Sequence, residues 1–360
     1  MATLSIRDLD FGLDVSQFAA TGPAEERGVP RDKVKMLVIR RAEGSLAHTK
    51  FQSLPDFFEP GDVFVVNTSM TIPARLFATS QGQLHMVHLA ARLSANRFII
   101  ERRGKNGEAD SQAWGVGETV LIVQPEASGM NWQSSPARLK VIRRFHPQSR
   151  LWEVESSADL YELAQAIGSP IRYSYLKQET DTSDYETIFG RTPGSAEMPS
   201  ASRPFTSSVV RRLAAQGVKI ASITLHTTVS SHEVESDLSS HPVLPEWFSI
   251  SPQAATVIND AKAGGHRIVG VGTTAVRAVE SAVAANGEVQ AMEGWTTRLI
   301  TPDTPAQIIT SLVTGMHDNH TSHLALMYAF ISPSLLRHAY HEAAGAGYLW
   351  HEFGDISLLL

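Results

Sequence analysis

Three apolar segments of the chain are each followed by polar residues that could bind or react with a ligand. They are Asn67 after 63–66, His226 after 220–225, and Thr273 with Thr274 after 268–271. In sheets covered by helices, ligands bind beyond the carboxyl ends of the strands, where neighbouring strand ends meet. We therefore expect these side chains to share one pocket.

The segment 266–281 predicts a buried strand, a tight glycine turn and a helix that begins near Thr273 and Thr274. The start of a helix gathers free amides and the positive end of the helix dipole, which suits a carboxylate, a phosphate or a ribose hydroxyl. We expect Arg277 and Glu280, one turn further on, to face the same pocket. In the alternative interpretation, one threonine only caps the helix, and Arg277 and Glu280 form a solvated pair.

Metal and thiol chemistry have little support in the sequence. The absence of cysteine excludes disulfides, thiolate metal sites and cysteine nucleophiles. His317, His320 and His323 are spaced by three, but the polar residues between them favour a loop and a helix cap over a metal-binding stripe on a helix. No His-Glu-x-x-His, Gly-x-Gly-x-x-Gly or Gly-Lys-Thr motif occurs, so we expect no metal, nicotinamide or nucleoside triphosphate.

The composition is that of an ordinary folded protein, with 42% apolar and 19% charged residues. The net charge of −6 argues against broad coating of a nucleic acid and leaves room for a local basic patch. The N-terminal residues lack the pattern of a signal peptide, and no uncharged apolar run is long enough to cross a bilayer. We therefore expect a soluble, cytoplasmic protein.

The chain is expected to form a main α/β domain from residues 1–76 and 158–360, with an inserted domain at 77–157. The unbroken apolar segment 63–66 predicts a strand buried on both faces, as in a parallel or mixed sheet. Within the insertion, five alternating segments separated by turn residues predict a small antiparallel barrel or sandwich. The other predicted elements are strands at 36–41, 218–225 and 296–300, and helices at 158–166, 206–216, 305–316 and 324–330.

The inserted domain is the one basic part of the chain. Residues 77–157 contain ten Lys and Arg against seven Asp and Glu, a balance of +3, so the remaining chain carries −6 − 3 = −9. The insertion could therefore bind a polyanion, although barrel edges also use Lys and Arg to prevent strand pairing. The long irregular segment 168–205 is of the kind that is usually functional or mobile.

A series of short motifs runs in a fixed order and spacing along nearly the whole chain. The motifs are Arg31-Asp32, Pro60-Gly-Asp62, Asn67 with Ile72-Pro-Ala-Arg-Leu76, Tyr185 with Thr187, Pro199 with Ala201 and Phe205-Thr206, Leu225-His226, His241 with Glu246, Gly272-Thr-Thr with Arg277 and Glu280-Ser281, Thr314 with His317, and Tyr348 with Gly354-Asp355. In these motifs the chain resembles the S-adenosylmethionine:tRNA ribosyltransferase-isomerase family of queuosine biosynthesis.

The resemblance implies an α/β domain with barrel-like character that is interrupted by a small β-barrel domain. It also implies that the ribosyl part of S-adenosylmethionine is transferred to the aminomethyl group of a deazaguanine base in tRNA and rearranged, with release of adenine and methionine. The sulfonium acidifies the adjacent ribose carbon, so a positioned base can remove a proton while a general acid helps adenine to leave. S-adenosylmethionine is the substrate, and no metal is needed.

Several positions inside the motifs differ from the family pattern. Asn-Asp-Thr-Arg becomes Asn67-Thr-Ser-Met70, Pro-Thr-Ala-Gly-Leu-His-Phe becomes Pro199-Ser-Ala-Ser-Arg-Pro-Phe205, and Tyr-Arg-Phe-Phe-Ser-Tyr-Gly-Asp becomes Tyr348-Leu-Trp-His-Glu-Phe-Gly-Asp355. These changes indicate a different substrate or reaction. The alternatives to tRNA modification are therefore a small-molecule acceptor and a binding protein without catalysis.

Within this interpretation each candidate residue has an expected role. Imidazole and carboxylate groups can be tuned toward neutrality in a closed pocket, which makes them suited to proton transfer. The candidates for catalysis are His226, His317 and Glu246, and the candidates for binding S-adenosylmethionine are Asn67, Thr273, Thr274, Arg277 and Glu280. The alternative for each proton-transfer candidate is a buried side chain whose hydrogen bonds are satisfied within the fold.

Overall fold

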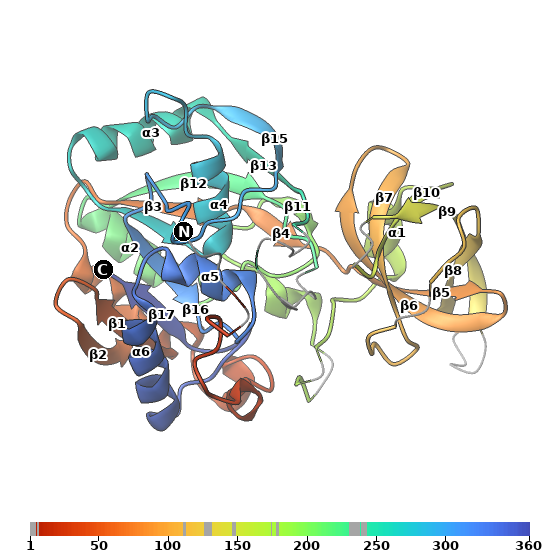
Figure 1. Cartoon of the computed structure of the whole chain (residues 1–360), viewed down its shortest axis with the longest axis horizontal. Coiled ribbons are helices and arrows are strands. Elements are labelled where there is room, and N and C mark those ends of the chain that lie inside the picture. Colours follow the sequence, from red (N-terminus) through yellow and green to blue (C-terminus); the bar gives the residue numbers. More distant parts are fainter. Residues whose placement is uncertain are drawn as a thin grey trace.

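The computed structural model describes the chain except residues 1–4, 6, 111–112, 126–131, 146–148, 174, 178–179, 230–237 and 239–242. Figure 1 shows a large α/β part and, beside it, a smaller part made of strands. The expected fold class, α/β with an inserted β-barrel, is confirmed, although the main domain, expected to have barrel-like character, contains a nine-stranded sheet that does not close. The limits of the domains at residues 77 and 157 stay a prediction.

Nine strands of the described chain form one open, mixed sheet in the order β15-β13-β12-β3-β14-β16-β17-β1-β2. The four central strands β12, β3, β14 and β16 run parallel, so their carboxyl ends lie at one edge. The strands of this sheet are β1 Lys35–Arg40, β2 Ser45–Lys50, β3 Val63–Asn67, β12 Lys219–Leu225, β13 Glu246–Ile250, β14 Ile268–Val271, β15 Met292–Thr296, β16 Ser311–Gly315 and β17 Ile356–Leu359.

Strand β3 is buried on both faces, as its unbroken apolar sequence predicts. Val63 and Val65 belong to a core that contains residues of α3, α4, α5 and α6, whereas Phe64 and Val66 belong to a second core that contains residues of α2. The helices of the chain are α1 Leu160–Ile167, α2 Ser207–Ala215, α3 Pro252–Ala263, α4 Thr273–Ser281, α5 Ser322–Tyr328 and α6 Pro333–Gly345. Helices therefore cover both faces of the sheet, which leaves the strand ends as the place for a ligand site.

Serine or threonine caps begin several of these helices, as the sequence indicates. The Thr206 hydroxyl accepts a hydrogen bond from an amide in the first turn of α2, and Thr321 does the same for α5. Short 3₁₀ helices lie at Val15–Phe18, Glu25–Arg27, Arg31–Lys33, Phe51–Phe57, Thr182–Tyr185 and Ser200–Ser202. In the described part of the chain, no helix combines the length and the apolar character needed to span a membrane.

The inserted strands close into a barrel in the order β10-β7-β6-β5-β8-β9. They are β5 Arg75–Ser80, β6 Gln83–Arg92, β7 Arg97–Arg103, β8 Thr119–Pro125, β9 Trp132–Arg144 and β10 Leu151–Ser156. The sequence predicted five strands, and the sixth is β5, which is separated by three residues from the end of the short strand β4 Ser69–Thr71. Strand β4 pairs in parallel with β11 Thr192–Ser195, so the connection into the barrel is tied back to the long segment 168–205.

Two predicted elements near the C-terminus are wrong. A strand was expected at 296–300, but the strand of this region, β15, ends at Thr296. A helix was expected at 305–316, but this region is an extended segment followed by β16. The physical reason why no helix forms at 305–316 is the fully buried carboxylate of Glu280 on α4. It accepts hydrogen bonds from the backbone amides of Gln307, Ile308 and Ile309 at 2.8–3.0 Å. These amides therefore bond to a side chain instead of to helical carbonyls.

The variant Glu280→Gln tests this role. It is expected to be less stable by about 1–3 kcal/mol, because an amide NH₂ group cannot accept the backbone N–H that one carboxylate oxygen accepts. Urea unfolding measures the difference. Glu293→Gln, on the exposed surface of β15, is the control and is expected to change stability by less than about 0.5 kcal/mol. Equal stability of the Glu280 variant and the native chain would contradict the role.

Candidate active site

The buried side chain of Asn67 joins the ends of β3 and β12 to the start of α4. Its Oδ1 accepts hydrogen bonds from the amides of Ser69 and Leu225, both at 3.0 Å. Its Nδ2 donates to the Leu225 carbonyl at 2.8 Å and to Thr274 Oγ1 at 3.3 Å. The ends of β3 and β12 and the start of α4 therefore meet at Asn67, whose amide is fully used within the fold and lines neither of the cavities described below.

A cavity of about 260 Å³, which we call the strand-end cavity, lies where these strands end. Thr273 and Thr274 line it from α4, and His317 lines it from the loop after β16. The segment 168–205 and the loop after α6 supply the remaining walls, which include Tyr173, Tyr175, Glu197, His351 and Glu352. Thus the long irregular segment forms part of the candidate site.

The first turn of α4 points its amides toward this cavity without a side-chain cap. The N-cap residue is Gly272, whose positive φ of 83° favours glycine, and no side chain accepts a hydrogen bond there. The alternative in which Thr273 or Thr274 serves as the N-cap is therefore wrong. An uncapped helix start that lines a cavity suits an anion or a hydroxyl group.

His317 is half-buried and neutral at physiological pH. Its Nε2 lies 2.8 Å from the hydroxyl of Thr314, and its ring stacks on His323 with 5.4 Å between centroids. Burial lowers the pKa of His317 to about 3, and the neighbouring His323 adds to this effect. Within the described residues, no three His, Cys, Asp or Glu side chains are grouped as a metal site would require.

Glu352 is a carboxyl of this cavity whose proton affinity is strongly raised. Burial and the nearby charge of Glu197 raise the pKa of Glu352 to about 8, so the group is mostly protonated at neutral pH. The Tyr175 hydroxyl donates to Glu352 Oε2 at 3.4 Å, and the Tyr173 hydroxyl donates to Glu197. His351 stacks on Tyr175 with 4.3 Å between ring centroids and adopts a left-handed φ of 71°.

The candidate residues proposed from sequence did not include Glu352 or Glu197. A signal for Glu352 was present in the C-terminal motif, where His351 and Glu352 replace the Phe and Ser of the expected pattern. When two chemically active residues replace two unreactive or weakly reactive ones inside a motif, the replacement indicates that the new residues belong to the site. No comparable signal marked Glu197, because only the folded segment 168–205 brings it to Glu352.

Arg277 and Glu280 do not face the strand-end cavity, so that expectation is wrong. The guanidinium of Arg277 pairs with the carboxylate of Glu246 and donates to the Arg298 carbonyl at 3.2 Å. The second carboxylate oxygen of Glu246 accepts the amide of Thr228 at 3.1 Å. Glu246 and Arg277 therefore form a buried ion pair that links β13 to α4, and the bonds of Glu280 to 307–309 hold the other side of α4.

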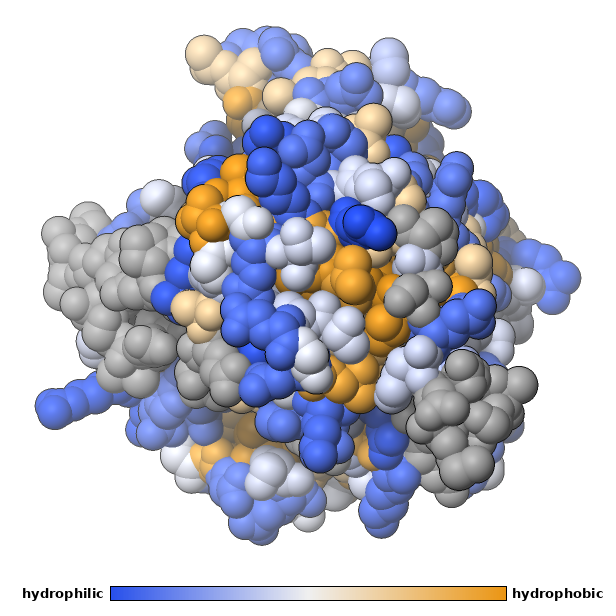
Figure 2. Space-filling view, turned by 90° about the vertical axis from the view of Figure 1, so that its right-hand side faces the viewer, coloured by the Kyte–Doolittle hydropathy of each residue, from blue (hydrophilic) through white to orange (hydrophobic). Residues whose placement is uncertain are grey.

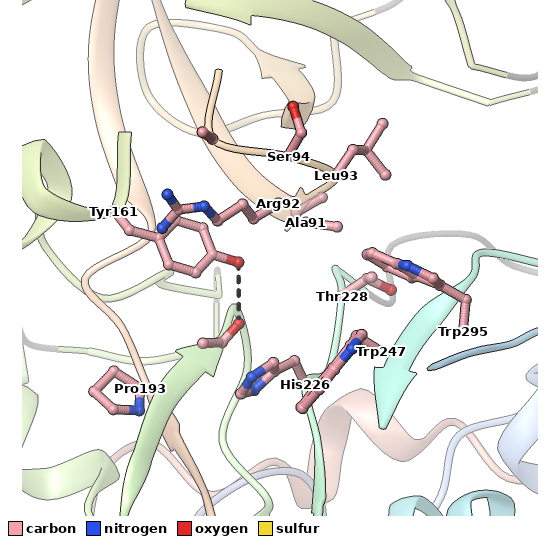
Figure 3. A pocket seen from close by; sticks show the side chains of 13 residues that line it. Ala91, Arg92, Leu93, Ser94, Tyr161, Pro193, His226, Thr228, Trp247 and Trp295 are labelled. Atoms are coloured by element: carbon pink, nitrogen blue, oxygen red, sulfur yellow. Dashed lines mark hydrogen bonds between the residues drawn. The ribbon is translucent and has the colours of Figure 1, made fainter. Parts of the chain in front are cut away.

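His226 lines a different cavity from Thr273 and Thr274, so the expectation of a single pocket holds only in part. This cavity of about 500 Å³, which we call the interdomain cavity, lies between the barrel and the ends of β12, β13 and β15. Figure 3 shows His226 beside Trp247 at its base. Burial lowers the pKa of His226 to about 4, so this imidazole is also neutral. The next residue, Thr227, lines the strand-end cavity. His241 of the Glu246 motif lies outside the described residues.

Comparison with known proteins identifies the family. The model of the family described as queuosine biosynthesis protein matches residues 6–359. The chain belongs to the queuosine biosynthesis protein family. Similar proteins include the S-adenosylmethionine:tRNA ribosyltransferase-isomerases of Moorella thermoacetica and Symbiobacterium thermophilum, which are 33% and 31% identical to it over 99% of this chain and 100% of each relative.

A solved structure supports the fold of this queuosine family member. It is the S-adenosylmethionine tRNA ribosyltransferase of Thermotoga maritima, with a TM-score of 0.53 and 24% identity over 98% of this chain and 100% of that chain. The resemblance inferred from the scattered motifs is therefore confirmed over the full length. The changes inside the motifs, Glu352 among them, are differences within one family.

The raised pKa of Glu352 predicts a specific pH dependence of stability. Between about pH 4.5 and 8 the folded chain holds a proton that the unfolded chain has lost, so this contribution to stability disappears as the pH rises. Glu352→Gln does not titrate. The stability of this variant relative to the native chain is therefore expected to increase from pH 5 to pH 8, as measured by urea unfolding. Glu293→Gln is the control, and a constant difference for Glu352→Gln would refute the shift.

Proposed function

We propose that this chain transfers the ribosyl part of S-adenosylmethionine to the aminomethyl group of a deazaguanine base at the wobble position of tRNA. The transferred group is rearranged to an epoxycyclopentane, and adenine and methionine are released. Membership of the queuosine biosynthesis family supports this activity. The observation that carries the assignment of the site is the strand-end cavity, where an uncapped helix start, a neutral imidazole and a protonated carboxyl face one space.

In this proposal the start of α4 binds the carboxylate or the ribose hydroxyls of S-adenosylmethionine. Thr273 and Thr274 offer hydroxyl groups beside the uncapped amides of the first turn. Asn67 acts indirectly, because its Nδ2 holds Thr274 Oγ1. Arg277 and Glu280 also act indirectly, since their bonds fix α4 on both sides.

The proton transfers are assigned to groups whose charge states fit them. The neutral imidazole of His317 has a lone pair that can take the proton from the ribose carbon next to the sulfonium, and its pKa of about 3 makes it a weaker base than an exposed imidazole. The protonated carboxyl of Glu352 can donate a proton to adenine as the glycosidic bond breaks. The stacked rings of Tyr173, Tyr175 and His351 form an aromatic wall that limits the access of water to this space.

The barrel is proposed to contact the tRNA. The insertion 77–157 has a net charge of +3 in a chain that is otherwise acidic. Figure 2 views the molecule from the barrel side, where hydrophilic residues dominate the surface and hydrophobic residues gather mainly near the middle. Because tRNA is a cytoplasmic molecule, the proposal also places this enzyme in the cytoplasm.

Incubation with S-adenosylmethionine, alone and with tRNA that carries the aminomethyl deazaguanine, tests the activity. We expect adenine and methionine only with the tRNA, as followed by mass spectrometry. The value of kcat/KM is expected to fall about tenfold between 50 and 200 mM salt if two phosphates are contacted. Release without tRNA would support a small-molecule acceptor, and binding of S-adenosylmethionine without release would support a binding protein. Either outcome would overturn the proposal.

The variant His317→Ala tests the assignment of the base. We expect kcat to fall about 10²- to 10⁴-fold, because the group that accepts the proton is lost, while the Kd for S-adenosylmethionine changes little. His338→Ala, on the exposed surface of α6, serves as the control. A fall in affinity without a change in kcat would assign His317 to binding instead.

A further inference from the structure

The interdomain cavity has two aromatic walls on neighbouring strands. Trp247 of β13 and Trp295 of β15 are direct cross-strand partners. The indole of Trp247 stacks on the imidazole of His226, with 5.2 Å between centroids and 20° between the ring planes. Trp295 is 44% exposed, which is unusual for so large an apolar side chain and leaves a face available for stacking. Figure 3 shows both indoles along one side of the cavity.

A chain of hydrogen bonds determines which nitrogen of His226 carries the proton. The Thr227 amide donates to Ser195 Oγ at 3.0 Å, Ser195 Oγ lies 2.6 Å from Ser69 Oγ, and Ser69 Oγ lies 2.7 Å from His226 Nδ1. An amide can only donate, and each hydroxyl has one proton to pass on. The direction that uses every proton therefore ends with Ser69 donating to Nδ1. In the opposite direction, the Ser195 hydroxyl would have no acceptor among the described residues.

This direction leaves the proton of the neutral imidazole on Nε2. Among the described residues Nε2 has no hydrogen-bond partner, and His226 lines the cavity, so the ring presents an N–H donor to a ligand. The ring cannot easily turn away. A Cβ added at Gly194 would lie 2.5–2.7 Å from three of its atoms, which shows how closely the backbone of β11 approaches the imidazole.

The opposite wall comes from the barrel and from α1, which packs in the same apolar cluster as the barrel strands. Tyr161 of α1 donates a hydrogen bond to the Gly194 carbonyl at 3.4 Å. The guanidinium of Arg92, at the end of β6, lies 5.6 Å from the centre of the Tyr161 ring and pairs with Asp159 at 2.7 Å. Figure 3 shows Arg92 and Tyr161 across the cavity from the indoles. A guanidinium that is held by Asp159 and remains partly exposed thus lies beside an aromatic slot.

We propose that the interdomain cavity binds one unstacked base of an RNA strand, with the base on the indole of Trp295, a base acceptor atom on His226 Nε2–H and a phosphate near Arg92. Aromatic side chains beside a cationic group are the general means of binding a single-stranded base. The inference rests on the proposed function only in taking tRNA as the RNA. The same side chains could bind the adenine of S-adenosylmethionine. The experiments below distinguish a base of RNA from this adenine.

The first test compares two exposed apolar residues of β15. Trp295→Ala is expected to weaken the binding of the deazaguanine tRNA about 5- to 150-fold, the range measured for the loss of one base-stacking contact. Met292→Ala is the control, because Met292 is similarly exposed at 41%, lies on the same strand and does not line this cavity. The affinity for S-adenosylmethionine without RNA is expected to stay unchanged in both variants. Equal tRNA affinity of the two variants would overturn the proposal, as would a loss confined to S-adenosylmethionine.

The second test concerns the donor on His226. The side-chain amide of Gln reaches about as far as Nε2, whereas that of Asn ends near the position of Nδ1. His226→Gln is therefore expected to keep the tRNA affinity within about threefold of the native chain, and His226→Asn to lose about tenfold, the equivalent of one hydrogen bond of about 1.4 kcal/mol. Equal affinities of the two variants would refute the donor. Normal tRNA binding without release of adenine would refute the proposed reaction and leave this binding site intact.

Discussion

The hydrogen bonds of the buried Asn67 amide are the interaction on which both cavities depend. A buried amide costs free energy unless its donors and acceptors are paired, and here they bond to the neighbouring strand end and to the first turn of α4. The position of Thr274 in one cavity and of His226 in the other follows from these bonds, because Leu225 immediately precedes His226. One polar side chain thus fixes the geometry of an edge that is otherwise built from apolar strands.

Burial sets the charge states of the candidate groups in the same way on both sides of this edge. Desolvation disfavours any charged form, so it lowers the pKa of His226 and His317 and raises that of Glu352. All three groups are mainly uncharged near pH 7. A substrate that carries its own positive charge, as a sulfonium does, would enter a site where it meets few competing charges.

The sequence predicts the parts of this structure that local patterns determine. The apolar run 63–66 predicts a strand covered on both faces, and the glycine turn before Thr273 predicts the start of a helix. The structure confirms both predictions. The side chains of Arg277 and Glu280 point toward partners that are distant in the sequence, Glu246 for the first and residues 307–309 for the second. No local pattern reveals these partners. For the same reason a helix was expected where the carboxylate of Glu280 takes up the amides.

Strand β12 ends between the two cavities, an arrangement that suits the two different substrates of the proposed reaction. His226 faces the interdomain cavity and Thr227 faces the strand-end cavity, and the chain from Thr227 through Ser195 and Ser69 to His226 connects the two walls. A base held beside Trp295 and a ribosyl donor held at α4 would lie on either side of this turn. Because β11 supplies Gly194 and Ser195 to the same turn, the segment that leads back from the barrel takes part in both walls. The inserted barrel and the segment that leads back from it therefore line the interdomain cavity together.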